Sequence, residues 1–448
     1  MDYSLPFSRP SQTYVPLILH LLLWGVVAST VLAFLPLNNE FLNPSGWYSP
    51  EYYKLKENIN GVSPLLRGLK DGLALLLLVG SLGFKPTNPN QRLQHNGDLK
   101  LLYRVGLLLL TIALLRALTT PLSLAQIFTT LRPLIISAAI FVFCYRHLDP
   151  TYLRWLLEAL NPLALLQVYY AYRQRNNSVD WHGVSFWSHG AVRSVGTFAE
   201  PNSLGLFLAL VAYLNISVLP PHPLRYVLVI AYAATTIYFA DSRTAALVIA
   251  IVLTLELYRH FSRLERLLRN PLVIGFILGP LMLGFSYWLL GQVNASSVRG
   301  GMSDASGGRF EAVVGAINSS GPISILVGKY LGAGSNILQV LNQADSRDAT
   351  DLILSDSTLA ALINQVGLLG LMVFVGILYI LLRLPTRGLP LPGPEDRHQP
   401  APLRQERVGV AAILLVVGLT SVIFEMYAIW PILVPLIFPW RWAEKPVA

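Results

Sequence analysis

One short stretch of the sequence brings together several side chains that could do chemistry. The stretch Arg193–Gly205 places an arginine, a glutamate and an Asn-Ser pair directly before an apolar run, Leu204–Leu219. Charged side chains at the mouth of a membrane helix are costly and usually mark a functional site. The same residues also fit an ordinary interfacial helix start, with Pro201 in the first turn, Glu200 near the positive helix end and Arg193 reaching toward lipid headgroups.

Other arginines are expected on the same outer side of the membrane, although they belong to apolar runs and loops that are far apart in the sequence. They are Arg116, Arg132, Arg243 in the turn Asp241-Ser-Arg243, and Arg309 in the segment Gly307-Gly-Arg-Phe-Glu311. Arginine keeps its charge and binds phosphate through a planar fork of donors. We therefore predict a pyrophosphate-binding group made of Arg193, Arg243, Arg309 and Arg132.

Each of these arginines has a simpler interpretation. Arg116 fits a helix end whose side chain reaches the membrane surface, and we do not include it in the predicted site. Asp241-Ser can be ordinary turn and cap chemistry, and the two glycines before Arg309 can form a flexible turn. Arg132 lies deeper in its apolar run, where a charge requires a partner.

A transfer reaction also needs a base, and two carboxylates are candidates. Asp356 stands at the start of an apolar run and Glu200 lies beside Arg193, so we predict Asp356 as the catalytic base and Glu200 as the second candidate. Asp356-Ser357 is equally typical of a helix N-cap. We expect no metal and no cofactor, because the sequence has no P-loop, no zinc motif and no calcium-loop spacing.

The composition indicates a polytopic membrane protein. The 448 residues are 54% hydrophobic and 13% charged, whereas a soluble domain has roughly 25% charged residues. The net charge of +9 comes from basic residues in short connections between apolar runs, which is the positive-inside pattern rather than a sign of nucleic-acid binding. Cys144 is the only cysteine, so no disulfide within the chain is expected.

The apolar runs predict an all-α fold of about 12 transmembrane helices, with one large periplasmic loop that contains short helices. We expect spans 1–9 within residues 1–290, the loop at 291–355, and spans 10–12 within 356–448, with a cytoplasmic linker at 384–407. The charge bias places both termini in the cytoplasm of a multi-pass inner-membrane protein, with the active site at the periplasmic face. The expected spans are Val15–Leu35, Leu65–Phe84, Leu101–Leu118, Ile127–Tyr145, Tyr152–Tyr172 (interrupted by Pro162), Ser203–Leu219, Arg225–Ala240, Thr244–Tyr258, Leu272–Leu290, Ser357–Leu382, Val408–Phe424 and Met426–Trp440.

With these residues placed, the chain resembles the superfamily of O-antigen polymerases and O-antigen ligases, which are bacterial membrane glycosyltransferases of the GT-C type. The likeness rests on motifs in a fixed order: Arg193 with Gly196-Thr-Phe-Ala-Glu-Pro-Asn202, Asp241-Ser-Arg-Thr-Ala245, Gly307-Gly-Arg309, Gly328-Lys-Tyr-Leu-Gly-Ala-Gly334, Asp356-Ser-Thr-Leu359 and Gly367-Leu-Leu-Gly370.

The resemblance implies a metal-independent, inverting transfer of a glycan from undecaprenyl pyrophosphate to a sugar hydroxyl. Arg193 and Arg243 match family arginines at the outer ends of spans, and Arg309 matches a loop arginine. Ligases commonly have a histidine where this chain has Asp356, which favours a polysaccharide polymerase over a ligase.

The expected partners follow from that activity. They are the undecaprenyl-pyrophosphate-linked glycan donor, a glycan acceptor and membrane lipids, with a chain-length regulator or a flippase as further candidates and no nucleic acid. The alternative of the same class is an O-antigen ligase that moves the finished glycan to a lipid or protein acceptor. The alternative of another class is a secondary transporter or flippase, which the lack of an inverted repeat and of a charged pair near the midplane disfavours.

Overall fold

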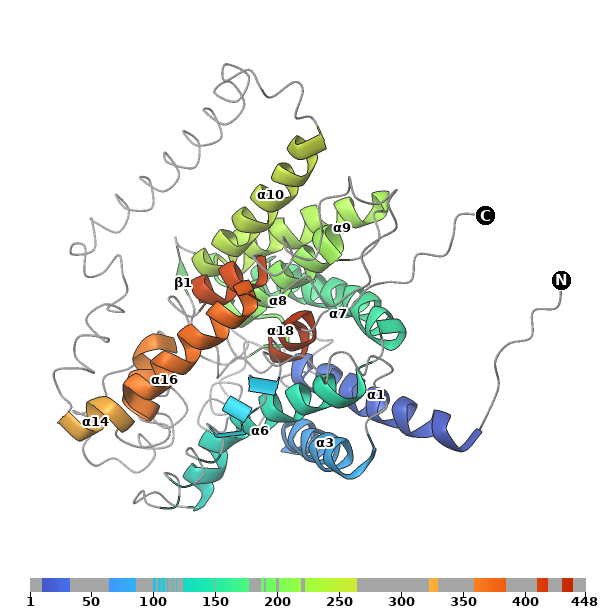
Figure 1. Cartoon of the computed structure of the whole chain (residues 1–448). Helices are drawn as coiled ribbons and strands as arrows, with labels where there is room; N and C mark the ends of the chain where they lie inside the picture. The colour runs from blue at the N-terminus through green and yellow to red at the C-terminus, as the bar shows by residue number, and fades with distance from the viewer. Residues whose placement is uncertain are drawn as a thin grey trace.

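The computed structural model describes residues 10–32, 64–85, scattered positions between 100 and 118, 124–148, 150–176, 187–188, 191–198, 201–218, 222–263, 322–328, 358–383, 409–417 and 429–437. Most of these residues are helical, as Figure 1 shows. In chain order the elements are α1 (Pro10–Val31), α3 (Pro64–Gly83), α6 (Leu124–His147), α7 (Pro150–Asn176), β1 (Trp187–Ser188), β2 (Ala191–Val192), α8 (Pro201–Tyr213), the π-helix η4 (Leu214–Val218), α9 (Pro223–Ala234), the π-helix η5 (Thr235–Phe239), α10 (Arg243–Arg263), α14 (Pro322–Val327), α16 (Thr358–Arg383) and α18 (Trp430–Ile437).

Proline sets the start of several of these helices. The helices α1, α3, α7, α8, α9 and α14 all begin at a proline. The first helical residue has no intrahelical partner for its N–H group, and the fixed φ of proline already suits a helix, so proline is favoured at this position. The expectation that Pro201 lies in the first turn of its helix is confirmed.

The helices form two groups that share one core. In the first, α3 packs against both α1 and α6, and α18 packs against α6. In the second, α8 lies between α7, α9 and α10 (Figure 1). Leu204 and residues 206 to 214 of α8 and η4 are all 1% exposed or less, and Gly205 between them is also buried, which is the pattern of a helix that is apolar on every side and lies inside a core.

Where the predicted spans fall on described residues they are largely helical, but the prediction that they cross a membrane is wrong. Within the described ranges, no helix combines the length and the hydropathy that a bilayer crossing requires. A hydropathy window counts apolar residues without detecting where a helix ends or bends. The helices α8, α9 and α18 have only 13, 12 and 8 residues, whereas a span needs about 20. The backbone of α16 is interrupted at Gly367, with φ 68°.

Other details of the expected organisation also differ or lie outside the description. The expected interruption at Pro162 is wrong, because α7 continues through it. The all-α expectation missed the antiparallel pair of β1 and β2, in which Trp187 pairs with Val192. The expected span Leu272–Leu290 and the linker at 384–407 lie outside the described residues, as does the 291–355 loop apart from residues 322–328.

The last turn of α3 is capped by the end of α6. The imidazole Nε2 of His147 lies 3.0 Å from the carbonyl oxygen of Ser81, and the guanidinium of Arg146 donates to the carbonyl of Phe84 at 3.1 Å. The final carbonyl groups of a helix have no intrahelical donor and bear a partial negative charge. The two side chains of α6 therefore satisfy α3 where its own backbone cannot.

The burial of His147 makes the stability of the folded protein depend on pH. Burial lowers the pKa of His147 from its ordinary value of 6.5, the hydrogen bond to Ser81 opposes this, and the neighbouring charge of Arg146 lowers the pKa further. The unfolded chain therefore takes up the proton at a higher pH than the folded protein. We expect the free energy of unfolding to fall as the pH drops from about 7.5 to about 5.5. In His147→Gln, which can still donate but does not titrate, the fall should be smaller. An equal fall in both proteins would contradict this role for His147.

Candidate functional site

Arg193 connects the segment after β2 to the turn before α10. Its Nε donates to the carbonyl of Ala240 at 3.0 Å, and its Nη2 donates to the carbonyl of Asp241 at 2.9 Å and to Oδ1 of Asn202 at 3.3 Å. Hydrogen bonds from a charged donor are stronger than neutral ones. One half-buried guanidinium thus joins three segments, including the first turn of α8.

The turn that Arg193 holds has an uncommon backbone. Asp241 has a φ of 46°, the only positive φ outside glycine in the part of the chain that the structure describes. This left-handed conformation costs a residue with a Cβ about 1–2 kcal/mol, although aspartate tolerates it better than most residues. Such conformations persist where the surroundings enforce them, and they cluster at functional sites. The charge-assisted hydrogen bonds from Arg193 to the carbonyls of Ala240 and Asp241 provide that enforcement.

Ser242 completes the turn and begins α10. Its Oγ accepts from the backbone N–H of Ala245 at 3.4 Å and donates to Oδ1 of Asn202 at 3.1 Å. A serine that accepts from the third residue of a helix is an N-cap. The contact with Asn202 depends on close packing of α8 against α10, because a Cβ at Gly205 would lie 2.8 Å from the Cβ of Ser242.

Two buried glutamines of α7 hold the backbone that follows Arg193. Oε1 of Gln174 accepts from the N–H groups of Val195 and Gly196 at 3.0 and 2.9 Å, and its Nε2 donates to the carbonyl of Gly196 at 2.9 Å. Oε1 of Gln167 accepts from the N–H of Thr197 at 2.8 Å, and its Nε2 donates to Oγ1 of the same residue at 2.7 Å. The two side-chain amides thus satisfy backbone N–H and C=O groups that would pair with a neighbouring strand in a β-sheet.

The remaining contacts anchor this loop to α1, α7 and η5. Thr197 Oγ1 donates to the carbonyl of Val31 at the end of α1. Ser194 donates through its N–H to the carbonyl of Phe239 and through its Oγ to the carbonyl of Ala171. Gly196 has a φ of 60°, and a Cβ there would collide with Oε1 of Gln167, so only glycine fits. The loop therefore has one defined conformation in which Arg193 points at the turn before α10.

The structure brings part of the predicted site together. Arg193 is in direct contact with the turn Asp241-Ser-Arg243, through the backbone carbonyls of Ala240 and Asp241. Arg243 is the first residue of α10, but its side chain lies outside the described part of the structure. The candidates Glu200, Arg309 and Asp356 also lie outside the described residues, so their roles remain predictions.

Arg132 has a different environment from the one predicted for a phosphate ligand. Its Nε lies 2.7 Å from both carboxylate oxygens of Asp71 on α3. The two side chains are only 22% and 16% exposed. This satisfies the requirement that a charge within an apolar run needs a partner. The geometry favours a structural ion pair between α3 and α6.

Two of the glycines behind the family resemblance also meet in space. Gly328 follows α14, and Gly367 marks the interruption of α16. Both have positive φ values, of 84° and 68°. A Cβ on either would collide with the other segment's backbone, including Gln365 and Leu326. The glycines therefore allow α14 to lie directly against the interruption in α16.

The residues that the sequence analysis missed are Gln167 and Gln174. They are seven residues apart on α7, so they lie two turns apart on one helix face. Two fully buried amides on one face must find hydrogen-bond partners. The seven-residue spacing of the two glutamines could have predicted that both hydrogen-bond a buried polar segment. It could not have identified that segment.

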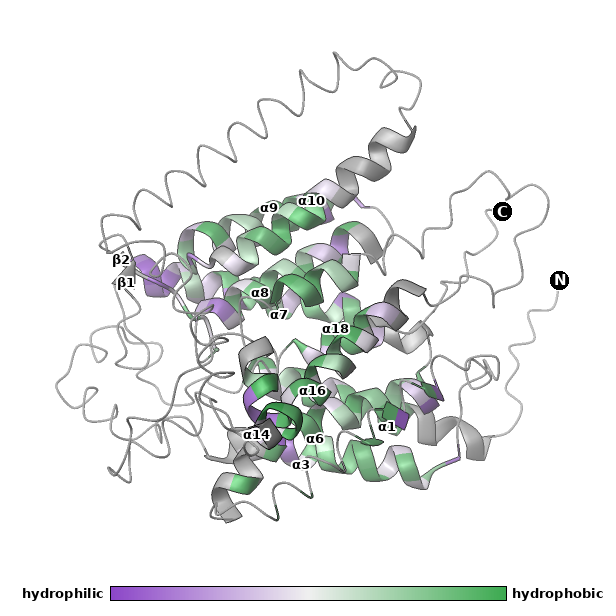
Figure 2. Ribbon diagram, turned by 60° about the vertical axis from the view of Figure 1, so that its left-hand side comes forward, coloured by the Kyte–Doolittle hydropathy of each residue, from purple (hydrophilic) through white to green (hydrophobic). Residues whose placement is uncertain are grey.

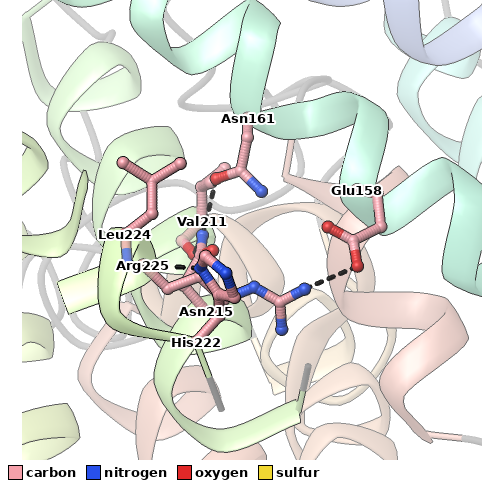
Figure 3. Close-up of polar contacts among 7 residues, drawn as sticks. All are labelled: Glu158, Asn161, Val211, Asn215, His222, Leu224 and Arg225. Atoms are coloured by element: carbon pink, nitrogen blue, oxygen red, sulfur yellow. Dashed lines mark hydrogen bonds and ion pairs between the residues drawn. The ribbon is translucent and has the colours of Figure 1, made fainter. Parts of the chain in front are cut away.

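A second polar cluster lies at the far end of α8 and joins α7, η4 and α9 (Figure 3). Nδ2 of Asn215 donates to Oδ1 of Asn161 at 2.7 Å, and Arg225 forms an ion pair with Glu158 at 2.6 Å. The hydroxyl of Tyr232 donates to Oδ1 of Asn161 at 3.1 Å, and burial raises the pKa of this phenol, so it remains a neutral donor. These contacts fix α7 and α9 relative to α8, and so support the Arg193 end from a distance.

Comparison with known proteins adds no assignment. The chain matches no protein-family model, and no curated protein matches it.

The Arg132–Asp71 pair can be tested by a double-mutant cycle. Removing one partner leaves a poorly solvated charge, so Arg132→Ala and Asp71→Ala should each lower the free energy of unfolding by about 2–3 kcal/mol. The double variant should lose clearly less than the sum of the two. Chemical unfolding of all four proteins measures this coupling. Strictly additive losses would show that the pair does not form, and Arg132 would again be a candidate phosphate ligand.

Proposed function

We propose that this chain is a glycosyltransferase that joins lipid-linked oligosaccharide units into a polysaccharide. One observation gives the proposal its main support: Arg193 holds a strained turn whose next residues are the cap and the first arginine of α10. The motifs shared with O-antigen polymerases and ligases contain the same residues. The reaction would take place at the periplasmic surface of a bacterial inner membrane.

The start of α10 suits an anionic group. The N–H groups of a first helical turn point outward and bear a partial positive charge, which makes a helix N-terminus a ready anion-binding site. An arginine at this position is unfavourable for the helix itself, because like charges meet there. Its presence is explained if Arg243 and the helix start bind the pyrophosphate of the donor together.

We propose that Arg193 positions the turn instead of binding pyrophosphate, the role that its sequence pattern suggested. Its Nε and Nη2 donate to backbone carbonyls, and a phosphate at these atoms would have to displace them. We therefore propose Arg193 as a positioning residue for the turn. The binding arginines would be Arg243 and, from the undescribed loop, Arg309.

In the proposed transfer, every bond, electron pair and proton is accounted for without a metal ion. The acceptor hydroxyl forms a bond to the anomeric carbon from the face opposite the pyrophosphate. The bond from that carbon to the phosphate oxygen breaks, and its electron pair leaves with undecaprenyl pyrophosphate, so the configuration is inverted. Asp356, or otherwise Glu200, would take the hydroxyl proton. Arg243 would stabilise the charge that develops on the leaving oxygen.

One exposed face of α9 is compatible with binding of a lipid-linked donor. On α9, Leu224, Val227 and Ile230 follow one another at intervals of three residues and are all more than half exposed. Figure 2 shows α9 as largely apolar. Exposed apolar side chains that share one helix face in this way are typical of contact with a partner, a membrane or an apolar ligand. A polyprenyl chain is such a ligand.

The direct test is an assay of the purified protein with an undecaprenyl-pyrophosphate-linked oligosaccharide and no second acceptor. We expect polymer growth and release of undecaprenyl pyrophosphate. Lysine keeps the charge of arginine but loses the planar fork. Arg243→Lys should therefore fold normally and lose about 30- to 1000-fold in rate. Arg263→Lys, at the other end of α10, is the matched control and should keep full activity.

Two results would contradict the proposal. If the wild-type protein releases no undecaprenyl pyrophosphate, the transfer reaction is wrong. If Arg243→Lys is as active as Arg263→Lys, the start of α10 does not bind the pyrophosphate. Transfer to an added lipid or protein acceptor without polymer growth would identify a ligase instead.

A further inference from the structure

A group of aromatic rings lies beside the Arg193 turn and has no part in the reaction described above. We call Tyr172, Tyr238 and Phe239, together with Arg175, the tyrosine cluster. The rings of Tyr172 and Phe239 meet edge to face with centroids 6.1 Å apart, and those of Tyr238 and Phe239 do so at 5.3 Å. The guanidinium carbon of Arg175 lies 5.2 Å from the centre of the Tyr238 ring. The side chains thus support one another across α7 and η5.

These rings are ordered by their contacts, yet two of them remain open to the outside. Tyr172 is 51% exposed and Tyr238 is 63% exposed. Ring pairs and a guanidinium above a ring restrict side-chain motion, which lowers the entropy cost of binding at these positions. A fixed and exposed aromatic surface is a suitable place for a ligand to dock.

The tyrosine cluster is continuous with the candidate site. The carbonyl of Phe239 accepts the N–H of Ser194, and the next carbonyl, that of Ala240, accepts Nε of Arg193. On the other side, Oγ of Ser194 donates to the carbonyl of Ala171, the neighbour of Tyr172. Ser194 therefore joins both aromatic segments to the residue that organises the turn. The glycan of a substrate bound at the start of α10 would extend from there over the neighbouring surfaces of the protein. The tyrosine cluster is one of these surfaces.

We propose that the tyrosine cluster is a subsite for sugar rings of the glycan substrate, which rests on the proposed function. One face of a pyranose ring consists of C–H groups with a small positive charge, and the face of an aromatic ring is negative. The two surfaces stack without requiring a particular hydroxyl pattern. Arg175 adds a cationic group beside the ring that can interact with oxygen atoms of the sugar. The subsite would hold the chain next to the reacting unit.

The test measures binding of soluble glycans that lack any lipid or phosphate. The probes are cellohexaose, maltohexaose and chitohexaose, and saturation-transfer NMR detects their contact with the purified protein. We expect at least one probe to bind, and Tyr172→Ala and Tyr238→Ala each to weaken that binding about 10-fold. Tyr238→Phe keeps the ring and should bind almost as well as the wild type. Tyr226→Ala removes a tyrosine that is 45% exposed near the start of α9, and should change nothing.

The possible outcomes separate this inference from the proposed function. Absence of binding by all three hexasaccharides, or equal binding by the alanine variants, would overturn the subsite even if the wild-type protein makes polymer. Sugar binding that depends on the rings, without release of undecaprenyl pyrophosphate, would keep the subsite and overturn the transfer reaction. If the alanine variants lose binding to phosphatidylglycerol vesicles and not to sugars, the tyrosine cluster is a lipid contact and the inference is wrong.

Discussion

The guanidinium of Arg193 satisfies two backbone carbonyls in a turn that contains a left-handed aspartate. Without this donor, the carbonyls of Ala240 and Asp241 would lose a charge-assisted partner, and the strain at Asp241 would lack its compensation. The position of Ser242 as the cap of α10 depends on that turn. The candidate site is therefore organised by hydrogen bonds to the main chain more than by contacts among its side chains.

The surrounding helices keep Arg193 in place. The two glutamines of α7 hydrogen-bond the backbone of residues 195–197, and Thr197 connects the same loop to the end of α1. The helix α8 is buried from Leu204 onward and packs against α10, and its Asn202 contacts both Arg193 and Ser242. The polar cluster around Asn161 and Asn215 fixes the opposite end of α8. Rigid support of this kind is what a site needs to hold a charged group at a defined distance from a substrate.

The sequence was sufficient for some of these features and not for others. Apolar runs located most of the described helices. The arginines of the sequence pattern pointed to the region of Arg193 and the Asp241-Ser-Arg243 turn, which the structure brings into contact. The same runs did not predict where α8 gives way to the π-helix η4 or where α16 bends, because local hydropathy does not encode helix ends that tertiary contacts decide. Arg132 was predicted to need a partner, but Asp71 is 61 residues away and only the packing of α3 on α6 identifies it.

The central claim is that Arg193 organises the turn before α10. Amide hydrogen exchange, read by mass spectrometry on peptides that cover residues 194–198 and 240–246, tests it in the full-length protein. Arg193→Ala should speed exchange in both segments by about 10-fold or more, because their hydrogen bonds then open more often. Arg173→Ala, a change in the last turn of α7, should leave both segments as in the wild type. Unchanged exchange in Arg193→Ala would contradict the account, since the turn would then keep its structure without the arginine.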